Sequence, residues 1–600
     1  MTRGKRLFLY VSLLFVLFGC GQSSKTAEEI LGNPDYLAFS YGGYRENTRD
    51  EVPTVDELKD DMKILSRMGV KILRTYNTSQ YAHAKNLLAA IHELKDEDPT
   101  FEMYVMLGTW IESKGAWTDT PDPSKGNLEN NTQEIDAAIA MANKYPDIVK
   151  SIAVGNEAMV QWAVTYFVMP KVILKWVNHL QDAKASGDLP ADIWITSSDN
   201  FESWGGGAKN YHTEDLTALL RAVDFVSLHT YPFHDTHYNP QFWGIPKEQE
   251  GLSEMEQINA AVERSVAYAQ TQYQNTASFI KSLGIDKPIH IGEIGWASID
   301  SSHYGPGGAK AADEYKQKLF YEQVREWTNS AGLSCFYFEA FDEQWKDKKN
   351  SLGSENHFGM INLKNEAKYT LWSDVDAGLF DGLTRNGKAI TKTYAGDKQA
   401  MLKDVLRPPL KSEMGILEIT TINASITSGE PVSEESYILV HETMTPDDAN
   451  KMTYPSSPSK LNAWEGTSSI KMSDGGVIEV ITGKGDWWGA AVEIRGGVGE
   501  NLSQFIDGYL HFDIRGDTSS NFKIGFQTGF FAEGTQVNNF VSFAPVSGRM
   551  LSTEWVSYSV PISELNKGAD LSNVTGALFL RSDEKSDGKY IFVKNIYYSK

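Results

Sequence analysis

Two apolar runs of the sequence, Ile152–Glu157 and Ile289–Trp296, each carry a glutamate where a buried strand would end. A carboxylate in that position loses hydration, so it needs a compensating role. A pair of carboxylates can cleave a glycosidic bond, one as general acid/base and the other as nucleophile. The alternative is that Glu157 and Glu293 are structural groups, each paired with a nearby Lys or Arg. The surrounding sequence favours the catalytic interpretation.

The segment from about Pro34 to Leu406 alternates short apolar runs with longer amphipathic patterns. In Val55–Met68 and Thr132–Tyr145, apolar residues recur at three- and four-residue spacing, as on one face of a helix. The runs predicted as strands are Tyr36–Tyr41, Val70–Tyr76, Phe101–Thr109, Val149–Gly155, Ile193–Ser198, Phe225–Tyr231, Pro288–Gly292 and Cys335–Ala340.

These β/α alternations predict an α/β fold, a (β/α)8 TIM barrel over residues 34–406. Functional side chains of such barrels gather at the C-terminal ends of the strands. Glu157 follows the fourth predicted strand, and Glu293 follows the seventh. An open, doubly wound sheet is the alternative, but the first predicted strand lacks the glycine-rich turn that binds phosphate in that fold.

The sequence changes character after the predicted barrel. Residues 407–435 begin with Arg407-Pro408-Pro409 and continue rich in Ser, Thr and Glu, which is typical of a linker. Residues 436–600 contain short strand-like runs between turn residues, which predicts an all-β sandwich. The strands predicted there are Val477–Ile481, Ala490–Ile494, Tyr509–Arg515, Phe522–Thr528, Phe540–Phe543, Trp555–Val560, Gly576–Leu580 and Tyr590–Tyr598.

Four stretches of the predicted barrel resemble glycoside hydrolase family 17, a β-1,3-glucanase family. Gly155-Asn156-Glu157 and Gly292–Trp296 resemble its acid/base and nucleophile segments. Phe341–Lys346 resembles its Phe-Asn-Glu-Asn-Gln-Lys motif, and Glu355–Met360 resembles the Glu and Phe-Gly-Leu segment that follows. The resemblance covers roughly the first two-thirds of the chain.

The resemblance implies a retaining mechanism with Glu293 as nucleophile and Glu157 as acid/base. In that mechanism the two carboxylates lie about 5 to 5.5 Å apart. The negative charge of Glu293 would raise the pKa of Glu157 until Glu293 becomes esterified. Asn156 is placed to hydrogen-bond the sugar 2-hydroxyl, an interaction that strengthens in the transition state.

Three more residues stand at the ends of predicted strands. Arg74 and Tyr76 end the second strand, and Tyr231 ends the sixth. Tyr231 can donate a hydrogen bond to Glu293 and hold it ionised, while Arg74 can support either carboxylate from behind. The alternatives are a half-buried core tyrosine at each position and a structural ion pair for the arginine.

The resemblance also implies that Glu343, Lys346 and Glu355 line glucose-binding subsites. Without it, the run Asp342–Lys349 is a solvated cluster of charges.

The rim of the predicted cleft departs from the family pattern. Asp342 replaces the usual Asn, Trp345 replaces Gln, and Ala297 stands where a Pro often follows the tryptophan. These changes leave the glucan specificity open. Trp110 and Trp296 are candidate platforms on which sugar rings stack, and the alternative is that each only packs a loop.

Three histidines, His229, His234 and His237, cluster after the sixth predicted strand. No carboxylate or cysteine at matching spacing completes a zinc set, so we expect solvated loop histidines and neither a metal nor a cofactor.

Composition favours a neutral ligand. The formal net charge of −23 opposes nucleic acid as a partner. The 15 Trp and 27 Tyr suit carbohydrate, because aromatic faces stack on the apolar faces of pyranose rings. Cys335, in an apolar run, is predicted to be a buried structural thiol.

The N-terminal segment resembles a bacterial lipoprotein signal. Basic residues precede the apolar run Leu7–Phe18, and Gly19 precedes Cys20. We expect residues 1–20 to act as a signal, lipidation of Cys20, a polar tether over residues 21–33, and location in the outer membrane. A simple signal with an incidental cysteine is the alternative.

Trp464, Trp487 and Trp488 lie in turn-rich stretches of the predicted sandwich, which resembles carbohydrate-binding modules; a purely structural domain is the alternative. We expect a lipid-anchored, monomeric, retaining endo-β-1,3-glucanase of the laminarinase kind that acts on β-glucan. Two other functions stay open: a β-1,3-glucan transglycosylase and a non-catalytic surface glycan-binding lipoprotein. The second would require the loss of a catalytic glutamate, and both are present.

Overall fold

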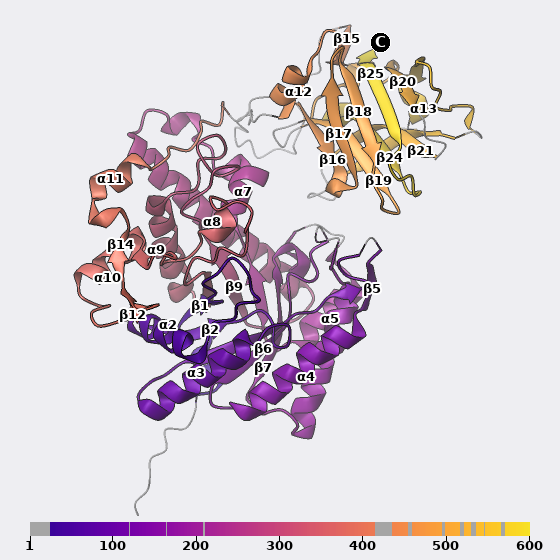
Figure 1. The fold of residues 1–600 in the computed structure, drawn as a ribbon. Helices are drawn as coiled ribbons and strands as arrows, with labels where there is room; N and C mark the ends of the chain where they lie inside the picture. The colour runs from indigo at the N-terminus through magenta and orange to yellow at the C-terminus, as the bar shows by residue number, and fades with distance from the viewer. Residues whose placement is uncertain are drawn as a thin grey trace, which may run out of the picture.

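The computed structural model describes residues 25–413 and 435–600. Short gaps fall at residues 119, 162, 164, 208–210, 454–458, 495–498, 517–520, 530–535, 545–546 and 566–570. Figure 1 shows two bodies, a barrel formed by the N-terminal part of the chain and a sheet-rich domain formed by the C-terminal part. The predicted signal, Cys20 and residues 414–434 of the predicted linker lie outside the described residues.

The first domain is a closed barrel of parallel strands. These are β1 (Leu37–Ser40), β2 (Val70–Arg74), β3 (Tyr104–Thr109), β6 (Val149–Asn156), β7 (Trp194–Asn200), β8 (Val226–His229), β9 (Ile289–Gly295) and β10 (Cys335–Phe338). They pair in the order β1-β10-β9-β8-β7-β6-β3-β2, and β2 returns to β1. Each overlaps one of the predicted strands, so the TIM-barrel prediction is confirmed. The strands could be predicted because a strand buried on both faces is a nearly continuous apolar run.

Helices follow the strands and cover the outside of the barrel (Figure 1). They are α2 (Val55–Arg67), α3 (His83–Glu97), α4 (Leu128–Lys144), α5 (Pro170–Ser186), α6 (Glu214–Ala222), α8 (Glu254–Ser282) and α9 (Glu314–Ser330). α2 starts at a capping box in which Thr54 and Glu57 each accept a backbone N–H of the other residue. The short helix α7 (Pro232–Tyr238) lies in the loop after β8, and the hairpin β4 (Ser113–Lys114) and β5 (Asp122–Gly126) follows β3.

The segment after β10 is tied to the first βα unit through a buried charge. It contains β11 (Glu366–Ala367), α10 (Trp372–Asp376), β12 (Thr384–Arg385), β13 (Lys388–Ala389), β14 (Thr391–Lys392) and α11 (Lys398–Lys403). Asp61 of α2 accepts hydrogen bonds from Arg385 at 2.9 Å, Arg45 at 3.0 Å and the Tyr41 hydroxyl at 2.9 Å. Because Asp61 and Arg385 are both fully buried, the charge of Arg385 needs this partner, whereas Asp61 also pairs with Arg45.

The expected polar tether over residues 21–33 is wrong for its second half. Residues Ala27–Ile30 form helix α1, which starts at a capping box of Thr26 and Glu29. Ala27 and Ile30 are buried in an apolar cluster with residues from the N-terminal halves of the barrel strands. Two apolar side chains at helical spacing are enough to dock the segment on the floor of the barrel.

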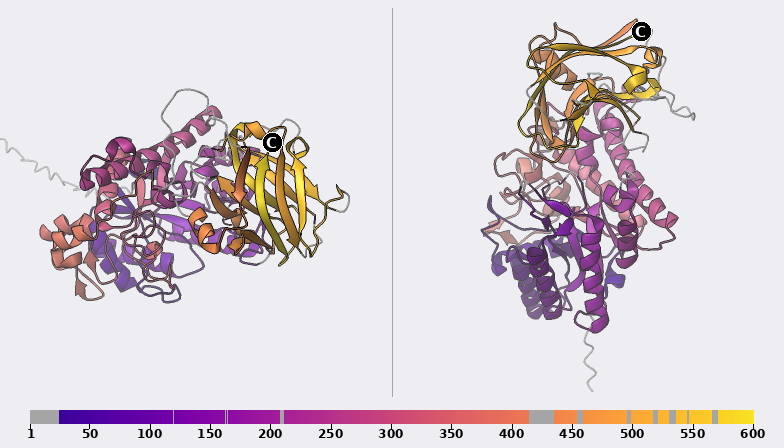
Figure 2. Two further views of the ribbon diagram at one scale, coloured as in Figure 1. Left: turned by 90° about the horizontal axis from the view of Figure 1, so that it is seen from above. Right: turned by 90° about the vertical axis from the view of Figure 1, so that its right-hand side faces the viewer.

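The C-terminal domain is a β-sandwich. One sheet contains β15 (Ser436–Val440), β17 (Ser468–Ser473), β18 (Val477–Thr482), β20 (Tyr509–Gly516), β23 (Val556–Pro561) and β25 (Tyr590–Ser599). The other contains β16 (Ser459–Ala463), β19 (Trp488–Ile494), β21 (Phe522–Thr528), β22 (Val537–Phe543) and β24 (Val574–Ser582). Figure 2 shows the two sheets as facing layers, and side chains such as Phe512 and Phe526 fill one core between them.

The eight strands predicted in this domain are present, and three further strands were not predicted. β16 and β17 were missed because Ser, Lys and Asn interrupt their apolar pattern. β15 contains the continuous apolar run Tyr437–Val440, but it directly follows the Ser- and Glu-rich stretch predicted as a linker. The start of the predicted linker also differs from expectation, because Leu410 forms a parallel bridge with Ile245 of the barrel domain. In the described part of the chain, none of the helices is both long and apolar enough to span a membrane.

Candidate active site

The two strand-end glutamates lie at the same end of the barrel. Glu157 directly follows β6, and Glu293 lies in β9. β7 and β8 separate these strands, and in the register of the sheet His229 of β8 lies opposite Glu293. One oxygen of each carboxylate and one nitrogen of His229 all lie within 4.8 Å of one another. The barrel therefore brings together two carboxylates that are 136 positions apart in the sequence.

Glu293 is a buried carboxylate with three polar partners. Its Oε1 pairs with the Arg74 guanidinium, and its Oε2 accepts a hydrogen bond of 2.7 Å from the Tyr231 hydroxyl. Burial raises the pKa of this carboxyl, but the His229 imidazole, the Arg74 charge and the Tyr231 hydrogen bond lower it to about 2. Glu293 is therefore ionised at neutral pH although its side chain is only 7% exposed.

Glu157 lies in a different environment. Its side chain is 27% exposed, and its Oε1 lies 3.0 Å from Nδ1 of His229. Its backbone has φ +45°, which few non-glycine residues adopt, and its N–H donates to the Ser198 carbonyl at 2.9 Å. The structure thus holds one carboxylate buried beside a cation and the other partly open to solvent, so the two groups have different surroundings.

His229 corrects the expectation of a solvated loop histidine. It is fully buried and touches both carboxylates, since its Nδ1 also lies 3.7 Å from Oε2 of Glu293. Its Nε2 lies 2.7 Å from the Ser198 hydroxyl, which in turn lies 2.7 Å from the Ser227 hydroxyl. A Cβ at Gly292 would lie 2.1 Å from the Ser227 oxygen, so only glycine leaves room for this hydrogen-bonded row.

The same three groups are the metal-ligating cluster that the described residues offer. Glu157, His229 and Glu293 each have one suitable atom within 4.8 Å of the others. A divalent cation there would lie beside the Arg74 guanidinium, which already pairs with Glu293. The charges around the site therefore favour proton transfer and nucleophilic chemistry over metal binding.

Two more of the predicted residues surround Arg74. The second Nη of Arg74 donates to Oδ1 of Asn156, and its guanidinium lies 4.7 Å from the Tyr76 ring centroid. Arg74 itself is fully buried. It therefore fixes the amide of Asn156 and the carboxylate of Glu293 relative to each other.

A cavity of about 340 Å³ opens over this site. Among the predicted residues, its lining includes Tyr76, Trp110, Asn156, Glu293, Glu343, Lys346 and Glu355. Its lining also includes Trp345, which the sequence placed at the rim of the cleft, and residues that were not predicted, namely Tyr41, Gly42, Tyr44, Arg49, Asn77, His83 and Phe338.

The charged wall of this cavity is not a solvated cluster. Glu343 is 1% exposed and accepts the backbone N–H of Tyr44 at 2.9 Å. Lys346 lies between two carboxylates, at 2.8 Å from Glu339 and 3.4 Å from Glu343. Glu355 stands further out, 3.8 Å from His234. Glu339 was not predicted, although it follows the apolar run Cys335–Phe338 and so carries the same strand-end signal as Glu157 and Glu293.

Trp296 is not a cleft residue, which corrects the prediction of a stacking platform there. Its side chain is fully buried, and its Nε1 donates to the Ala311 carbonyl at 2.9 Å. Phe233 and Phe320 pack against it with ring centroids 5.4 and 4.8 Å away. A tryptophan just after a strand can point into the loops that cover the barrel, and the sequence does not fix that direction.

A tyrosine, an arginine and a tryptophan form an unpredicted wall of the cavity. The Arg49 guanidinium lies 4.3 Å from the Trp345 ring centroid, and the Tyr44 and Trp345 rings are 6.0 Å apart. Trp345 carried a signal, because it departs from the family motif. Tyr44 and Arg49 follow the first strand without any motif, so only their place after a strand end pointed to them.

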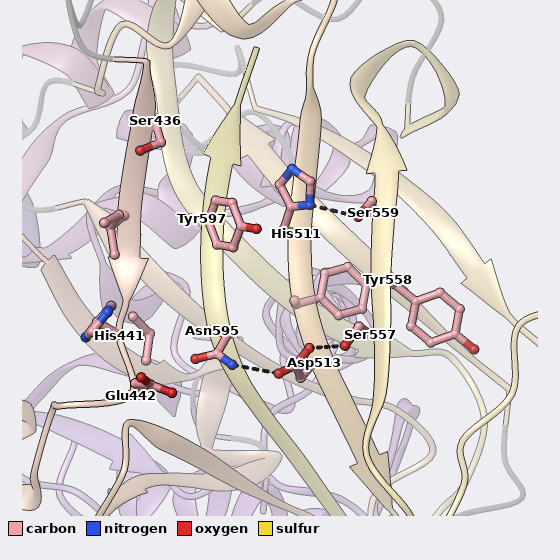
Figure 3. Close-up of a pocket in the computed structure, with 13 residues that line it drawn as sticks. Ser436, His441, Glu442, His511, Asp513, Ser557, Tyr558, Ser559, Asn595 and Tyr597 are labelled. Atoms are coloured by element: carbon pink, nitrogen blue, oxygen red, sulfur yellow. Dashed lines mark hydrogen bonds between the residues drawn. The ribbon is translucent and has the colours of Figure 1, made fainter.

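A second cavity, of about 520 Å³, lies on the sandwich over β15, β25, β20 and β23 (Figure 3). Asp513 accepts hydrogen bonds from Ser557 at 2.6 Å and Asn595 at 2.7 Å, and His511 contacts Ser559 at 2.8 Å. These five polar side chains of the lining are therefore paired with one another.

The three predicted sandwich tryptophans differ in position. Trp488 is fully buried in the core, so it is not a binding residue. Trp464 and Trp487 are only partly buried. Trp464 stacks on Phe579 of β24 with ring centroids 5.4 Å apart, and its Nε1 donates to Glu493 at 2.8 Å.

The charge pairing of Glu293 generates a pH-dependent prediction. Its folded pKa of about 2 lies below its unfolded value near ~4.3, so the group stabilises the fold above pH ~4 and loses this contribution as the pH falls towards 2. Arg74→Met should cost about 3–5 kcal/mol at neutral pH, because it leaves a buried charge unpaired. The loss of stability caused by Arg74→Met should be smaller at pH 4, where Glu293 of the variant can take up a proton. Calorimetric melting at pH 4 and 7 measures this difference.

The matched control places Arg74→Met in a Glu293→Gln background, where the carboxyl is absent. There the cost of the arginine substitution should no longer depend on pH. An equal pH dependence in both backgrounds would contradict the pairing.

Both domains of the chain are similar to known proteins. Residues 38–359 match the BtgE/BtgC glycoside hydrolase domain, and residues 430–600 match carbohydrate binding domain 30. A crystal structure of an endo-laminarinase from Formosa Hel1_33_131 is 58% identical, with a TM-score of 0.64, and covers 67% of this chain and 100% of that one.

Curated relatives include the probable glucan endo-1,3-beta-glucosidase btgC of Aspergillus terreus, 23% identical over 53% of this chain and 42% of that protein. The glucan 1,3-beta-glucosidase of Schizosaccharomyces pombe is 24% identical over 53% of this chain and 80% of that protein. The chain thus spans less than half the length of the Aspergillus relative. Because the matched barrel makes up more than half of its residues, the chain belongs to the BtgE/BtgC glycoside hydrolase domain family.

Proposed function

We propose that the barrel is a retaining endo-β-1,3-glucanase of the laminarinase kind. The observation that carries the proposal is the ionised Glu293 with an oxygen within 4.8 Å of an oxygen of Glu157. Retaining glycosidases hold their carboxyl groups about 5–5.5 Å apart, whereas inverting enzymes leave about 6.5–9.5 Å for a water molecule. The short separation therefore favours a covalent glycosyl-enzyme intermediate.

In the first step, a carboxylate oxygen of Glu293 attacks the anomeric carbon, and Glu157 gives its proton to the departing glycosidic oxygen. Arg74 and Tyr231 hold Glu293 in its ionised form before the attack. Esterification removes the negative charge of Glu293, which leaves His229 as the nearest polar partner of Glu157.

In the second step, Glu157 takes a proton from water, and the resulting hydroxide attacks the anomeric carbon and releases Glu293. The hydroxyl of a second sugar can take the place of water with the same two glutamates, which would make the product longer than the substrate. Analysis of the products therefore separates a hydrolase from a transglycosylase.

A neutral β-1,3-glucan fits the cleft. Trp110 and Tyr76 supply aromatic faces for pyranose rings, and Asn156 lies beside Glu293 through their shared partner Arg74. The 58% identity to an endo-laminarinase supports both the substrate and the endo mode.

We further propose that the sandwich binds glucan on the outer face of its five-stranded sheet. Leu578 and Leu580 of β24 point into the core, so Phe579 between them points to the other face, where Trp464 stacks on it. Trp487 lies on the same sheet with the Arg581 guanidinium 5.7 Å from its ring. Flat aromatic and polar side chains on one face suit a polysaccharide, and the match to carbohydrate binding domain 30 supports this role.

We also propose a lipid anchor on Cys20 that holds the exported protein at the outer membrane, on the support of the signal-like sequence of residues 3–20. Such an anchor would hold the glucanase at a membrane surface while leaving both domains in water.

The catalytic assignment predicts that Glu293→Ala lowers kcat on linear β-1,3-glucan by at least about 10⁴-fold, because the nucleophile is lost. Glu157→Ala should also lose activity. On a nitrophenyl β-1,3-oligoglucoside, whose leaving group departs without a proton, azide should restore part of that activity and yield a β-glycosyl azide, since a small anion needs no general base. Glu326→Ala, an exposed glutamate on α9, is the control. Proton NMR should show the β-anomer first, and an initial α-anomer would exclude retention.

The sandwich proposal predicts weaker binding when the outer face is altered. In the full chain carrying Glu293→Ala, the additional change Trp464→Ala should raise the Kd for insoluble β-1,3-glucan several-fold, because one aromatic face is lost. Trp555→Ala is the matched control, since Trp555 lies between Arg515 and Lys594 of the other sheet. Pull-down on insoluble β-1,3-glucan measures the binding of both variants. Equal binding of the two would contradict the proposal and leave the sandwich as a structural domain.

The anchor proposal predicts that Cys20→Ser moves the protein from the membrane fraction to the soluble fraction, because the lipidated thiol is removed. Fractionation of cells followed by an assay of glucanase activity measures the shift. Sedimentation of the variant with membranes would contradict the proposal.

A further inference from the structure

A tryptophan at the tip of the β4–β5 hairpin has a solvent-exposed side chain. Trp117 is 60% exposed, and its backbone has φ +65°, a conformation that costs energy for a bulky residue. Because the indole is exposed, burial of its apolar surface offsets little of this conformational cost. The position therefore needs a reason outside the packing of the barrel.

The indole of Trp117 is held in place by a buried carboxylate. Its Nε1 donates to Oε2 of Glu112 at 3.0 Å, and Nε1 of Trp110 donates to the same oxygen at 3.3 Å. Glu112 is 4% exposed, and its other oxygen accepts the side-chain amides of Asn127 and Asn130, each at 2.8 Å. Glu112 is thus a clamp that fixes both rings before any ligand arrives.

The fixed rings form a continuous aromatic surface with a tyrosine. Trp110 and Trp117 lie 6.4 Å apart and within 18° of parallel, and Tyr166 lies 5.2 Å from the first and 5.1 Å from the second. Trp110 also lines the catalytic cavity. The surface therefore runs from the cavity out to solvent.

This surface lies on the Glu157 side of the site. Tyr166 belongs to the loop that follows Glu157, and backbone hydrogen bonds join that loop to the hairpin, from Ser113 to Tyr166 at 3.1 Å and from Trp117 to Thr165 at 2.8 Å. Burial raises the pKa of the Tyr166 hydroxyl, and the nearby charges of Glu157, Asp199 and Glu293 add to the shift. The Tyr166 phenol thus lies close enough to both carboxylates to interact with them electrostatically.

A general acid protonates the leaving oxygen, so the sugar units released in the first step lie on the side of that acid. We propose that Trp110, Trp117 and Tyr166 form a stacking platform for the leaving-group side of a β-glucan chain. The inference rests on the proposed function and adds the direction in which the polymer crosses the site. It also accounts for the exposed indole, because pyranose rings stack on flat aromatic faces.

The test compares two substrates in the full chain. A long linear β-1,3-gluco-oligosaccharide reaches the platform, whereas a nitrophenyl β-1,3-oligoglucoside puts only its small aryl group on the leaving side. Trp117→Ala should lower kcat/KM on the oligosaccharide about tenfold, mainly through KM, and change the rate on the aryl substrate less than about twofold. Trp117→Phe, which keeps a ring, should retain most of the activity.

Tyr394→Ala is the control, because Tyr394 is also partly exposed, at 37%, and lies outside the cavity lining. Melting temperatures verify that each variant is folded. Loss of activity on both substrates alike, or on neither, in Trp117→Ala would overturn the platform while leaving the catalytic assignment intact. A wild-type chain that cleaves neither substrate would overturn the proposed function, and the platform with it.

Discussion

The site depends on keeping a buried carboxylate ionised. Glu293 loses most of its hydration, so without compensation its proton would stay bound. The compensation comes from Arg74 on β2, His229 on β8 and the hydroxyl of Tyr231 just after β8. Because Arg74 and Glu293 are 219 positions apart, their contact exists only when the barrel closes. Closure of the sheet is therefore a condition for the chemistry as well as for the fold.

The two carboxylates differ because the barrel gives them different surroundings. Glu293 sits inside a strand, beside a cation that is fully buried, and it stays charged. Glu157 sits one residue past the end of β6, in a left-handed backbone conformation and partly open to solvent, with an imidazole as its nearest side chain. Environments that separate two like groups in this way suit them to the different roles of nucleophile and acid/base.

The sequence predicted the barrel strands and the two glutamates for the same reason, since buried strands are apolar and a charge at the end of one is conspicuous. His229 ends a strand too, but together with His234 and His237 it was interpreted as a solvated loop histidine. Burial of Trp296 depends on Phe233 and Phe320, which come from other segments. Such contacts across the fold leave no local pattern to predict them from.

The barrel strands and the loops have different roles in catalysis and substrate recognition. Strand residues fix the carboxylates, whereas two loops, after β3 and after β6, carry the aromatic surface beside Glu157. Backbone hydrogen bonds, such as that from Val168 to Ala158 at 2.7 Å, tie the second loop back to the strand end. A side chain on these loops can therefore be substituted without moving Glu157. An insertion or deletion in the loop after β6 would instead shift the position of Glu157. Substrate preference can vary in such a fold while its chemistry is kept.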